Sequence, residues 1–308
     1  MSLFFHFTKI NTIKYQIMNG NSKRDFIIGD EWFYFKIYTG VKTADSLLVD
    51  YFVPMINIWK ENNYISKWFF IRYTDPEFHL RIRVYLSDQK NILPIIQDLN
   101  SLSKTLLEQN LIWKLQTDTY NRELERYGQN CMEDIENIFY HDSEMIAKIL
   151  RYTENTAVKN FQWLAGLYVL DNLLNLFKIP LEKKKSLMEK YVLGFSSEMN
   201  YDTNLKRQLS LKYRKNKNDI NHFLSEKSVH NELISFVTQR DQKIEPSVAK
   251  IISQVSNIEN IDELVFSISH MSFNRLYRTR GRENEFVSYH LLLYYYESKM
   301  AQLKYQEI

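Results

Sequence analysis

The sequence is poor in glycine, proline and cysteine. Its 308 residues include seven glycines, five prolines and a single cysteine, Cys131. One cysteine excludes an intramolecular disulfide and a cysteine-based zinc site, and it fits a reducing compartment. The scarcity of glycine argues against a glycine-rich phosphate-binding loop, and the patterns GxGxxG and GxxxxGK[ST] are both absent from the sequence.

Long apolar runs and a strong charge bias are also missing. No stretch approaches the roughly 18 apolar residues of a membrane span, and the N-terminus lacks the features of a signal peptide. We therefore expect a cytoplasmic protein without a membrane span. The net charge of +3 is too small to indicate direct nucleic-acid binding by itself. The seven histidines show no metal-ligand spacing, so we predict neither a metal nor a cofactor.

Aromatic residues, by contrast, are abundant. They make up 15% of the chain and include 21 tyrosines, which favours thick packing of helices on a sheet or a groove for a peptide. Hydrophobic periodicity predicts the following elements. Strands are expected at 31–38, 68–73, 78–85 and 111–120, and helices from Asp45 and at 91–110, 143–152, 156–178, 181–198, 203–229, 246–256, 261–278 and 283–303. Residues 1–130 are thus β-rich and 131–308 mostly helical. Because no flexible linker separates them, we predict a single α+β domain over 1–308.

A predicted β-hairpin carries a cluster of nitrogen-rich side chains. Residues 68–85 read WFFIRYTDPEFHLRIRVY, in which a turn separates two strands. Because side chains alternate along a strand, His79, Arg81 and Arg83 share one face, and apolar residues fill the other. Two arginines about 7 Å apart can hold the two ends of a dicarboxylate, or a carboxylate and a peptide carbonyl. The alternative is a solvated outer face or the charge protection of an edge strand.

Three other positions are candidates for chemistry. Lys36 lies among aromatic residues in the strand 31–38. His270 flanks the apolar stripe of a predicted helix, and Asn274 at i+4 would fix its tautomer, as a proton carrier requires. The alternative is a structural histidine that contacts only this asparagine. The run YNRELERYG at 120–128 suits a turn, but its charges can simply pair with one another at the surface.

Taken in order, these segments resemble the C-terminal module of class I lanthipeptide dehydratases, which also occurs in thiopeptide-type bacteriocin biosynthesis proteins. The segments are EWFYFKIY, the hairpin WFFIRYTDPEFHLRIRV, the run Y-x-x-E-x-x-RYG from Tyr120, and H-M-x-x-NR from His270. They span residues 30–300, nearly the whole chain. Gln129 departs from the pattern, because the family more often has a second glycine there.

The resemblance implies a function and a set of site residues. The module eliminates glutamate from glutamylated Ser or Thr of a ribosomally made precursor peptide, leaving dehydroalanine or dehydrobutyrine. A separate tRNA-dependent protein would then have to attach the glutamate. The family's catalytic roles fall on Lys36, Arg83 and His270. Substrate-binding roles fall on Arg81, His79, Arg72 and Asn274, although Arg72 shares its strand face with core residues.

Two other functions stay open from the sequence. The same module serves thiopeptide pathways as a free-standing pyridine synthase, which joins two dehydroalanines in a formal [4+2] cyclisation and expels the leader peptide. A non-catalytic partner that presents the precursor peptide to a dehydratase, through addition of a β-strand, is the third possibility. The free-standing length favours the cyclase, whereas Lys36, the HLRIR strand and His270 favour elimination. The sequence leaves the oligomeric state open.

Overall fold

The computed structural model describes residues 22–155, 161–225, 231–255 and 258–306. A four-stranded antiparallel sheet has the strand order β3-β4-β2-β5. Its strands are β2 (Trp32–Thr39), β3 (Ile65–Thr74), β4 (Phe78–Leu86) and β5 (Ile112–Thr117). The β2–β3 connection contains α1 (Ala44–Ser46), the π-helix η1 (Leu47–Phe52) and α2 (Val53–Glu61), and the β4–β5 connection contains η2 (Gln89–Asn91) and α3 (Ile92–Glu108). This is the split βαβ arrangement.

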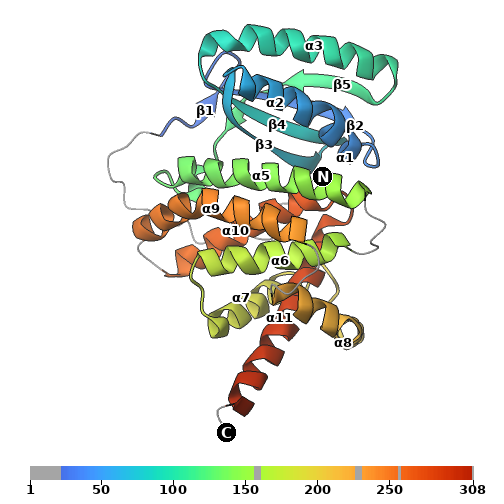
Figure 1. The fold of residues 1–308 in the computed structure, drawn as a ribbon, viewed down its shortest axis with the longest axis vertical. Helices are drawn as coiled ribbons and strands as arrows, with labels where there is room; N and C mark the ends of the chain where they lie inside the picture. Colours follow the sequence, from blue (N-terminus) through green and yellow to red (C-terminus); the bar gives the residue numbers. More distant parts are fainter. Residues whose placement is uncertain (1–21, 156–160, 226–230, 256–257, 307–308) are drawn as a thin grey trace.

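The rest of the described chain is almost entirely helical. A short ribbon of β1 (Asp25–Phe26) and β6 (Tyr120–Asn121) and the single-turn helix α4 (Leu124–Tyr127) lead into it. The long helices are α5 (Met132–Asn155), α6 (Phe161–Leu176), α7 (Leu181–Gly194), α8 (Thr203–Leu224), α9 (Asn231–Gln254), α10 (Ile258–Leu276) and α11 (Gly281–Gln306). Figure 1 shows α2 and α3 at the sheet end of the molecule, with α5 between the sheet and the other helices. No helix in the described ranges is long and apolar enough to cross a membrane.

The α+β class is confirmed, and so are the hairpin and the strand at 31–38. Several boundaries were wrong, among them the start of the helix expected at 143–152, which begins at Met132, and the end of the helix expected at 181–198, which ends at Gly194. The last sheet strand ends at Thr117, because Tyr120 pairs with Phe26 of β1 instead. The helix expected at 246–256 begins at Asn231 and continues through Pro246, since its buried apolar stripe offsets the backbone hydrogen bond that proline removes. The helices predicted at 156–178, 203–229 and 246–256 lie partly outside the described residues.

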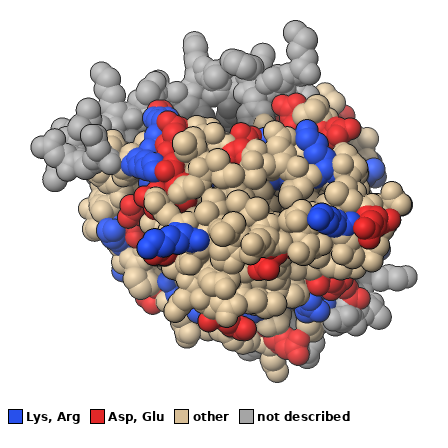
Figure 2. All heavy atoms as spheres, turned by 90° about the horizontal axis from the view of Figure 1, so that it is seen from above, with Lys and Arg blue, Asp and Glu red and all other residues tan. Residues whose placement is uncertain are grey.

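The sheet has two faces of different character. One is apolar and packs toward η1 and α2, as in the contact between the rings of Phe35 and Phe52. The other carries the polar side chains of β2 and β4. At the sheet end of the molecule, α3 exposes Leu93, Ile96 and Leu107, and Lys, Arg, Asp and Glu side chains are interspersed over that view of the surface (Figure 2).

Side chains from two helices cap the open edge of β3. The amide of Asn274 on α10 accepts from the N–H of Arg72 at 2.8 Å and donates to its carbonyl at 2.9 Å. Arg275 Nε donates to the carbonyl of Phe70 at 2.8 Å, and the N–H of Phe70 donates to Ser143 Oγ of α5 at 3.3 Å. The backbone groups of an edge strand need such partners when they are buried. This cap fixes α10, and hence His270, relative to the sheet.

Candidate functional site

The polar face of the sheet brings together four of the predicted side chains. The register pairs Lys36 with Arg81 and Tyr34 with Arg83, and the next pair is Tyr38 with His79. Directly opposed residues of antiparallel strands project to the same side. The sheet therefore places Lys36, His79, Arg81 and Arg83 on one face, as the alternation of the hairpin predicts.

Arg83 is a buried cation without a carboxylate partner among the described residues. It is 8% exposed, and its guanidinium carbon lies 4.4 Å from the ring centroid of Tyr34 and 4.8 Å from that of Tyr120. Its Nε has no hydrogen-bond partner. Burial lowers the pKa of Arg83, although Tyr34 and Tyr120 act against this. Aromatic rings only partly compensate the charge of a buried guanidinium. Binding of an anionic ligand would therefore stabilise it.

Arg81 is half-buried and well fixed. Its guanidinium carbon lies 3.4 Å from the ring centroid of Tyr73, and its Nε donates to His79 Nε2 at 3.0 Å. The other ring nitrogen of His79 donates to the carbonyl of Glu77 at 2.8 Å. Because His79 is fully buried and both its nitrogens are used, it has none free for a ligand. His79, which was predicted to bind substrate, instead contacts Arg81 and the backbone of Glu77.

Lys36 does not present a free charge to the site. Its Nζ forms an ion pair with Asp118, which follows β5 in the chain, and its side chain is 13% exposed. The ammonium also lies 5.7 Å from the ring centroid of Tyr34. Lys36 belongs to the same face as Arg81, but its charge is largely balanced within the protein.

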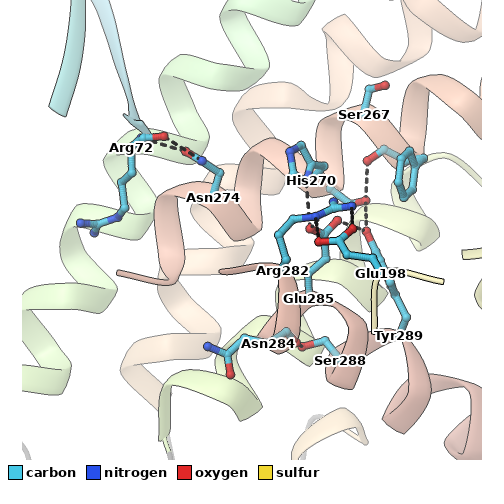
Figure 3. Close-up of polar contacts among 12 residues, drawn as sticks. Arg72, Glu198, Ser267, His270, Asn274, Arg282, Asn284, Glu285, Ser288 and Tyr289 are labelled. Carbon is cyan, nitrogen blue, oxygen red and sulfur yellow. Dashed lines mark hydrogen bonds and ion pairs between the residues drawn. The ribbon is translucent and has the colours of Figure 1, made fainter. Parts of the chain in front are cut away.

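Arg72 and Asn274, which were predicted to bind substrate, lie outside this face. Arg72 projects to the apolar side, where its Nη2 lies 2.6 Å from Asp45 Oδ1 and its Nε donates to the carbonyl of Arg275. Asn274 does not orient His270, because its amide is taken up by the backbone of Arg72 (Figure 3). The sequence spacing placed Asn274 on the correct side of the helix but could not reveal the strand edge beside it.

Glu285 of α11 takes the role that was expected of Asn274. Its Oε2 lies 2.9 Å from His270 Nδ1, and Tyr289 donates its hydroxyl to Oε1 at 2.7 Å (Figure 3). Burial by itself raises the pKa of Glu285, but His270, Arg282 and Tyr289 together lower it below the usual value. The ionised carboxylate accepts a hydrogen bond from the N–H at Nδ1, so the unprotonated Nε2 of the imidazole stays available as a base.

His270 and Glu285 form a hydrogen-bonded dyad, and two further charged side chains, Arg282 and Glu198, lie next to it. Arg282 lies 3.4 Å from Glu285 and makes a two-pronged contact with Glu198, at 2.7 and 3.1 Å. Its guanidinium also lies 4.0 Å from the ring centroid of Phe195. The side chain of His270 is 22% exposed, and its Nε2 has no hydrogen bond to the described residues. The imidazole is thus held on one side and accessible on the other.

Arg126 of α4 is a site residue that the sequence interpretation missed. Its Nε donates to Ser267 Oγ at 3.2 Å, one helical turn before His270. Its neighbour Tyr127 is buried, and its hydroxyl has no hydrogen-bond partner among the described residues. Burial raises the pKa of Tyr127 to about 12. Arg126 therefore lies beside the part of α10 that carries His270, and, although burial acts against this, the charge of Glu285 helps to raise its pKa. Arg126 is part of the RYG motif, but the sequence favoured simple pairing of its charge with nearby glutamates. Such a pair is present, with Glu123 at 3.3 Å, and the contact with Ser267 could not be predicted from local spacing.

Comparison with known proteins gives consistent matches. Residues 32–296 match the family described as lantibiotic biosynthesis dehydratase C-term. The subtilin biosynthesis protein SpaB of Bacillus subtilis is 24% identical over 263 residues, which cover 84% of this chain and 25% of SpaB. The nisin biosynthesis protein NisB of Lactococcus lactis subsp. lactis is 24% identical over 271 residues, which cover 87% of this chain and 26% of NisB. The chain thus spans about a quarter of the length of these relatives.

Two solved structures share the fold. The tRNA-dependent lantibiotic dehydratase MibB from Microbispora sp. 107891 has a TM-score of 0.71 at 20% identity, covering 89% of this chain and 28% of MibB. The pyridine synthase TbtD from thiomuracin biosynthesis has a TM-score of 0.58 at 14% identity, covering 87% of this chain and 98% of TbtD. The resemblance drawn from the sequence motifs is confirmed: the chain belongs to the lantibiotic biosynthesis dehydratase C-terminal family.

Proposed function

We propose that this protein is a lyase that eliminates glutamate from glutamylated Ser or Thr residues of a ribosomally made precursor peptide. The observation that carries the proposal is the combination of an unpaired buried guanidinium, Arg83, with the dyad of His270 and Glu285. The first suits the carboxylates of a glutamyl group, and the second suits removal of a proton. Arg126 adds a third positive charge next to the helix of His270, through its hydrogen bond to Ser267.

The reaction needs a base and cationic groups. His270 Nε2 takes the α-proton of the modified residue, and the electrons of that C–H bond form the double bond as the bond from Cβ to the ester oxygen breaks. Glutamate leaves as a carboxylate, which Arg81 and Arg83 hold, while Arg126 stabilises the charge that develops on the peptide carbonyl. His270 then loses the proton to solvent. Glu285 keeps the imidazole in the required tautomer throughout.

The same proposal implies two partners. The substrate is a precursor peptide, and we propose that a separate protein attaches the glutamyl group. The region shared with SpaB and NisB is about a quarter of their length. MibB is described as tRNA-dependent, which supports glutamyl-tRNA as the donor for that first step. Together, this protein and the glutamylating protein would convert Ser to dehydroalanine and Thr to dehydrobutyrine.

The pyridine synthase is the second candidate, and one observation favours it. The match to this chain covers 98% of TbtD, which is described as a pyridine synthase, so nearly the whole of that enzyme corresponds to the region compared. That reaction joins two dehydroalanines and has no glutamate to bind. An unpaired Arg83 beside Arg81 fits elimination better, since the cyclase has no multiply charged leaving group.

Mass spectrometry of a glutamylated precursor peptide incubated with the purified protein tests this function. We expect loss of glutamic acid from the peptide. His270→Ala should slow it by about 10²- to 10⁴-fold, the usual contribution of general acid–base catalysis. The matched control is His222→Ala on the exposed face of α8. Glu285→Gln should cost about 10- to 100-fold, as expected for the loss of a hydrogen bond to a charged group.

Two results would contradict elimination, and a third would contradict the role of His270. Conversion of a bis-dehydroalanine peptide to a pyridine with release of the leader, without any loss of glutamate, would establish the cyclase. Binding of precursor peptide without chemistry in either assay would favour the non-catalytic partner. Equal activity of the His270→Ala and His222→Ala proteins would remove His270 from the mechanism.

A further inference from the structure

The guanidinium of Arg81 is fixed by a small group of residues at the end of the hairpin. Its Nε donates to His79 Nε2 at 3.0 Å, and its carbon lies 3.4 Å from the ring centroid of Tyr73. His79 is itself immobilised, because its Nδ1 lies 2.8 Å from the carbonyl of Glu77 and its ring stacks on Tyr38 with centroids 4.6 Å apart. The imidazole is fully buried.

This contact limits how Arg81 can bind an anion. A guanidinium holds a carboxylate in two ways: side-on through Nε and one terminal nitrogen, or end-on through both terminal nitrogens. His79 occupies Nε, so only the end-on mode remains. Neither terminal nitrogen of Arg81 has a hydrogen bond within the described ranges. Arg83 differs, since its Nε has no partner and the side-on mode stays open to it.

We propose that His79 is a positioning residue that makes Arg81 bind one carboxylate of the glutamyl group end-on. This inference rests on the proposed function and deepens it, since it assigns a recognition geometry to each of the two arginines. Arg81 presents its two terminal nitrogens in the plane that stacks on Tyr73. The carboxylate therefore lies along the axis of the guanidinium, beyond its terminal nitrogens.

The role requires a neutral imidazole, because a protonated His79 would have no acceptor for Arg81. Burial lowers the pKa of His79. The positive charges of Arg81 and Lys36 lower it further, whereas the carbonyl of Glu77 and the carboxylate of Asp75 oppose this. The environment as a whole thus maintains the acceptor that the positioning role needs.

Binding of a non-reactive substrate mimic tests the inference. The probe is a precursor-derived peptide in which 2,3-diaminopropionic acid carries the glutamyl group through an amide, so elimination cannot occur. His79→Phe keeps a ring on Tyr38 but removes the acceptor, and we expect binding about tenfold weaker, as for loss of a hydrogen bond to a charged group. His79→Gln restores an acceptor and should bind more tightly than His79→Phe. Unfolding midpoints of both variants check that the fold is intact.

The decisive measurement is a double-mutant cycle with Arg81→Lys. If His79 acts through Arg81, adding His79→Phe to Arg81→Lys should weaken binding by much less than tenfold. Independent, additive losses would overturn the positioning role while leaving the proposed function in place. Failure of the wild-type protein to bind the mimic would overturn both. In the absence of ligand, the Arg81 Nε–H resonance should exchange slowly with water in the wild type and in His79→Gln, and rapidly in His79→Phe.

Discussion

At the scale of single residues, two buried arginines have opposite environments. Arg83 is surrounded by aromatic rings and has no carboxylate partner in the part of the chain that the structure describes. Arg275 is also buried, but its Nη1 lies 3.1 Å from Asp142 Oδ2 and its Nε donates to a backbone carbonyl. An unpaired charge costs the folded state free energy unless a ligand compensates, whereas a paired charge becomes costly only when its partner is removed.

Arg83→Met should therefore separate binding from stability. We expect the variant to lose affinity for the glutamylated mimic while its free energy of unfolding stays the same or increases by about 1–3 kcal/mol. Arg275→Met is the matched control, and it should destabilise the fold by about 3–5 kcal/mol because Asp142 loses its partner. Urea unfolding and titration with the mimic measure the two quantities. A strongly destabilised Arg83→Met protein would show that Arg83 is structural.

The candidate site was only partly predictable at this scale. Alternation along β4 predicted the shared face of His79, Arg81 and Arg83, because a strand repeats every two residues whatever surrounds it. The partner of His270 was not predictable in this way. Glu285 lies on the next helix, and the turn between α10 and α11 decides which residue reaches the imidazole. Local spacing favoured Asn274 as the partner of His270, but the amide of Asn274 bonds the backbone of Arg72 at the edge of β3.

At the scale of elements, the two edges of the sheet are treated differently. The edge of β3 is capped by side chains of α5 and α10. The opposite edge strand, β5, has exposed residues such as Trp113 and Lys114. The position of α10 relative to the sheet therefore depends on the β3 edge, and so does the placement of the dyad.

Asn274→Ala removes the side chain that caps the backbone of Arg72 at the edge of β3. Two backbone groups of Arg72 lose their partners, so we expect destabilisation by about 1–3 kcal/mol together with weaker catalysis. Asn172→Ala is a suitable control, because among the described residues the side chain of Asn172 donates only to the carbonyl of Tyr168 within its own helix. Comparison of the two variants by urea unfolding and by turnover measures both effects. A change no larger than that of the control would mean that water replaces the cap at little cost.

At the scale of the whole molecule, the sheet and the helices share buried polar contacts, and we propose that they unfold as one unit. The hydrophobic core is continuous from β2 to α11. The helical part also contains buried titratable groups away from the candidate site. His290 of α11 is 1% exposed and contacts the hydroxyl of Tyr201 at 2.7 Å through Nε2.

His290 makes the stability depend on pH. Burial, followed by the charge of Lys206, lowers the pKa of His290 to about 4. An unfolded histidine has a pKa of about 6.5, so between these values the unfolded chain binds a proton that the folded chain does not. Stability is full above about pH 6.5 and declines by about 3 kcal/mol as the pH falls to 4.

Urea unfolding at pH 7 and pH 4.5 tests this dependence. His290→Phe should lose less stability between the two conditions than the wild type, since the variant has no proton to bind at this position. His141, whose pKa burial also lowers to about 4, still titrates in the variant and contributes its own share. An identical loss in both proteins would show that His290 does not control the acid sensitivity.

The cap on the β3 edge also affects the order in which the protein can form during synthesis. Phe70 and Arg275, which are joined across this edge, are 205 residues apart in the chain. At about 5–20 residues per second, a ribosome needs roughly 10 to 40 s to produce the second after the first. The hairpin therefore emerges long before its cap, with a strand edge that other nascent chains can pair with. Expression at low temperature or with chaperones should for this reason matter more to the yield of this protein than its native stability suggests.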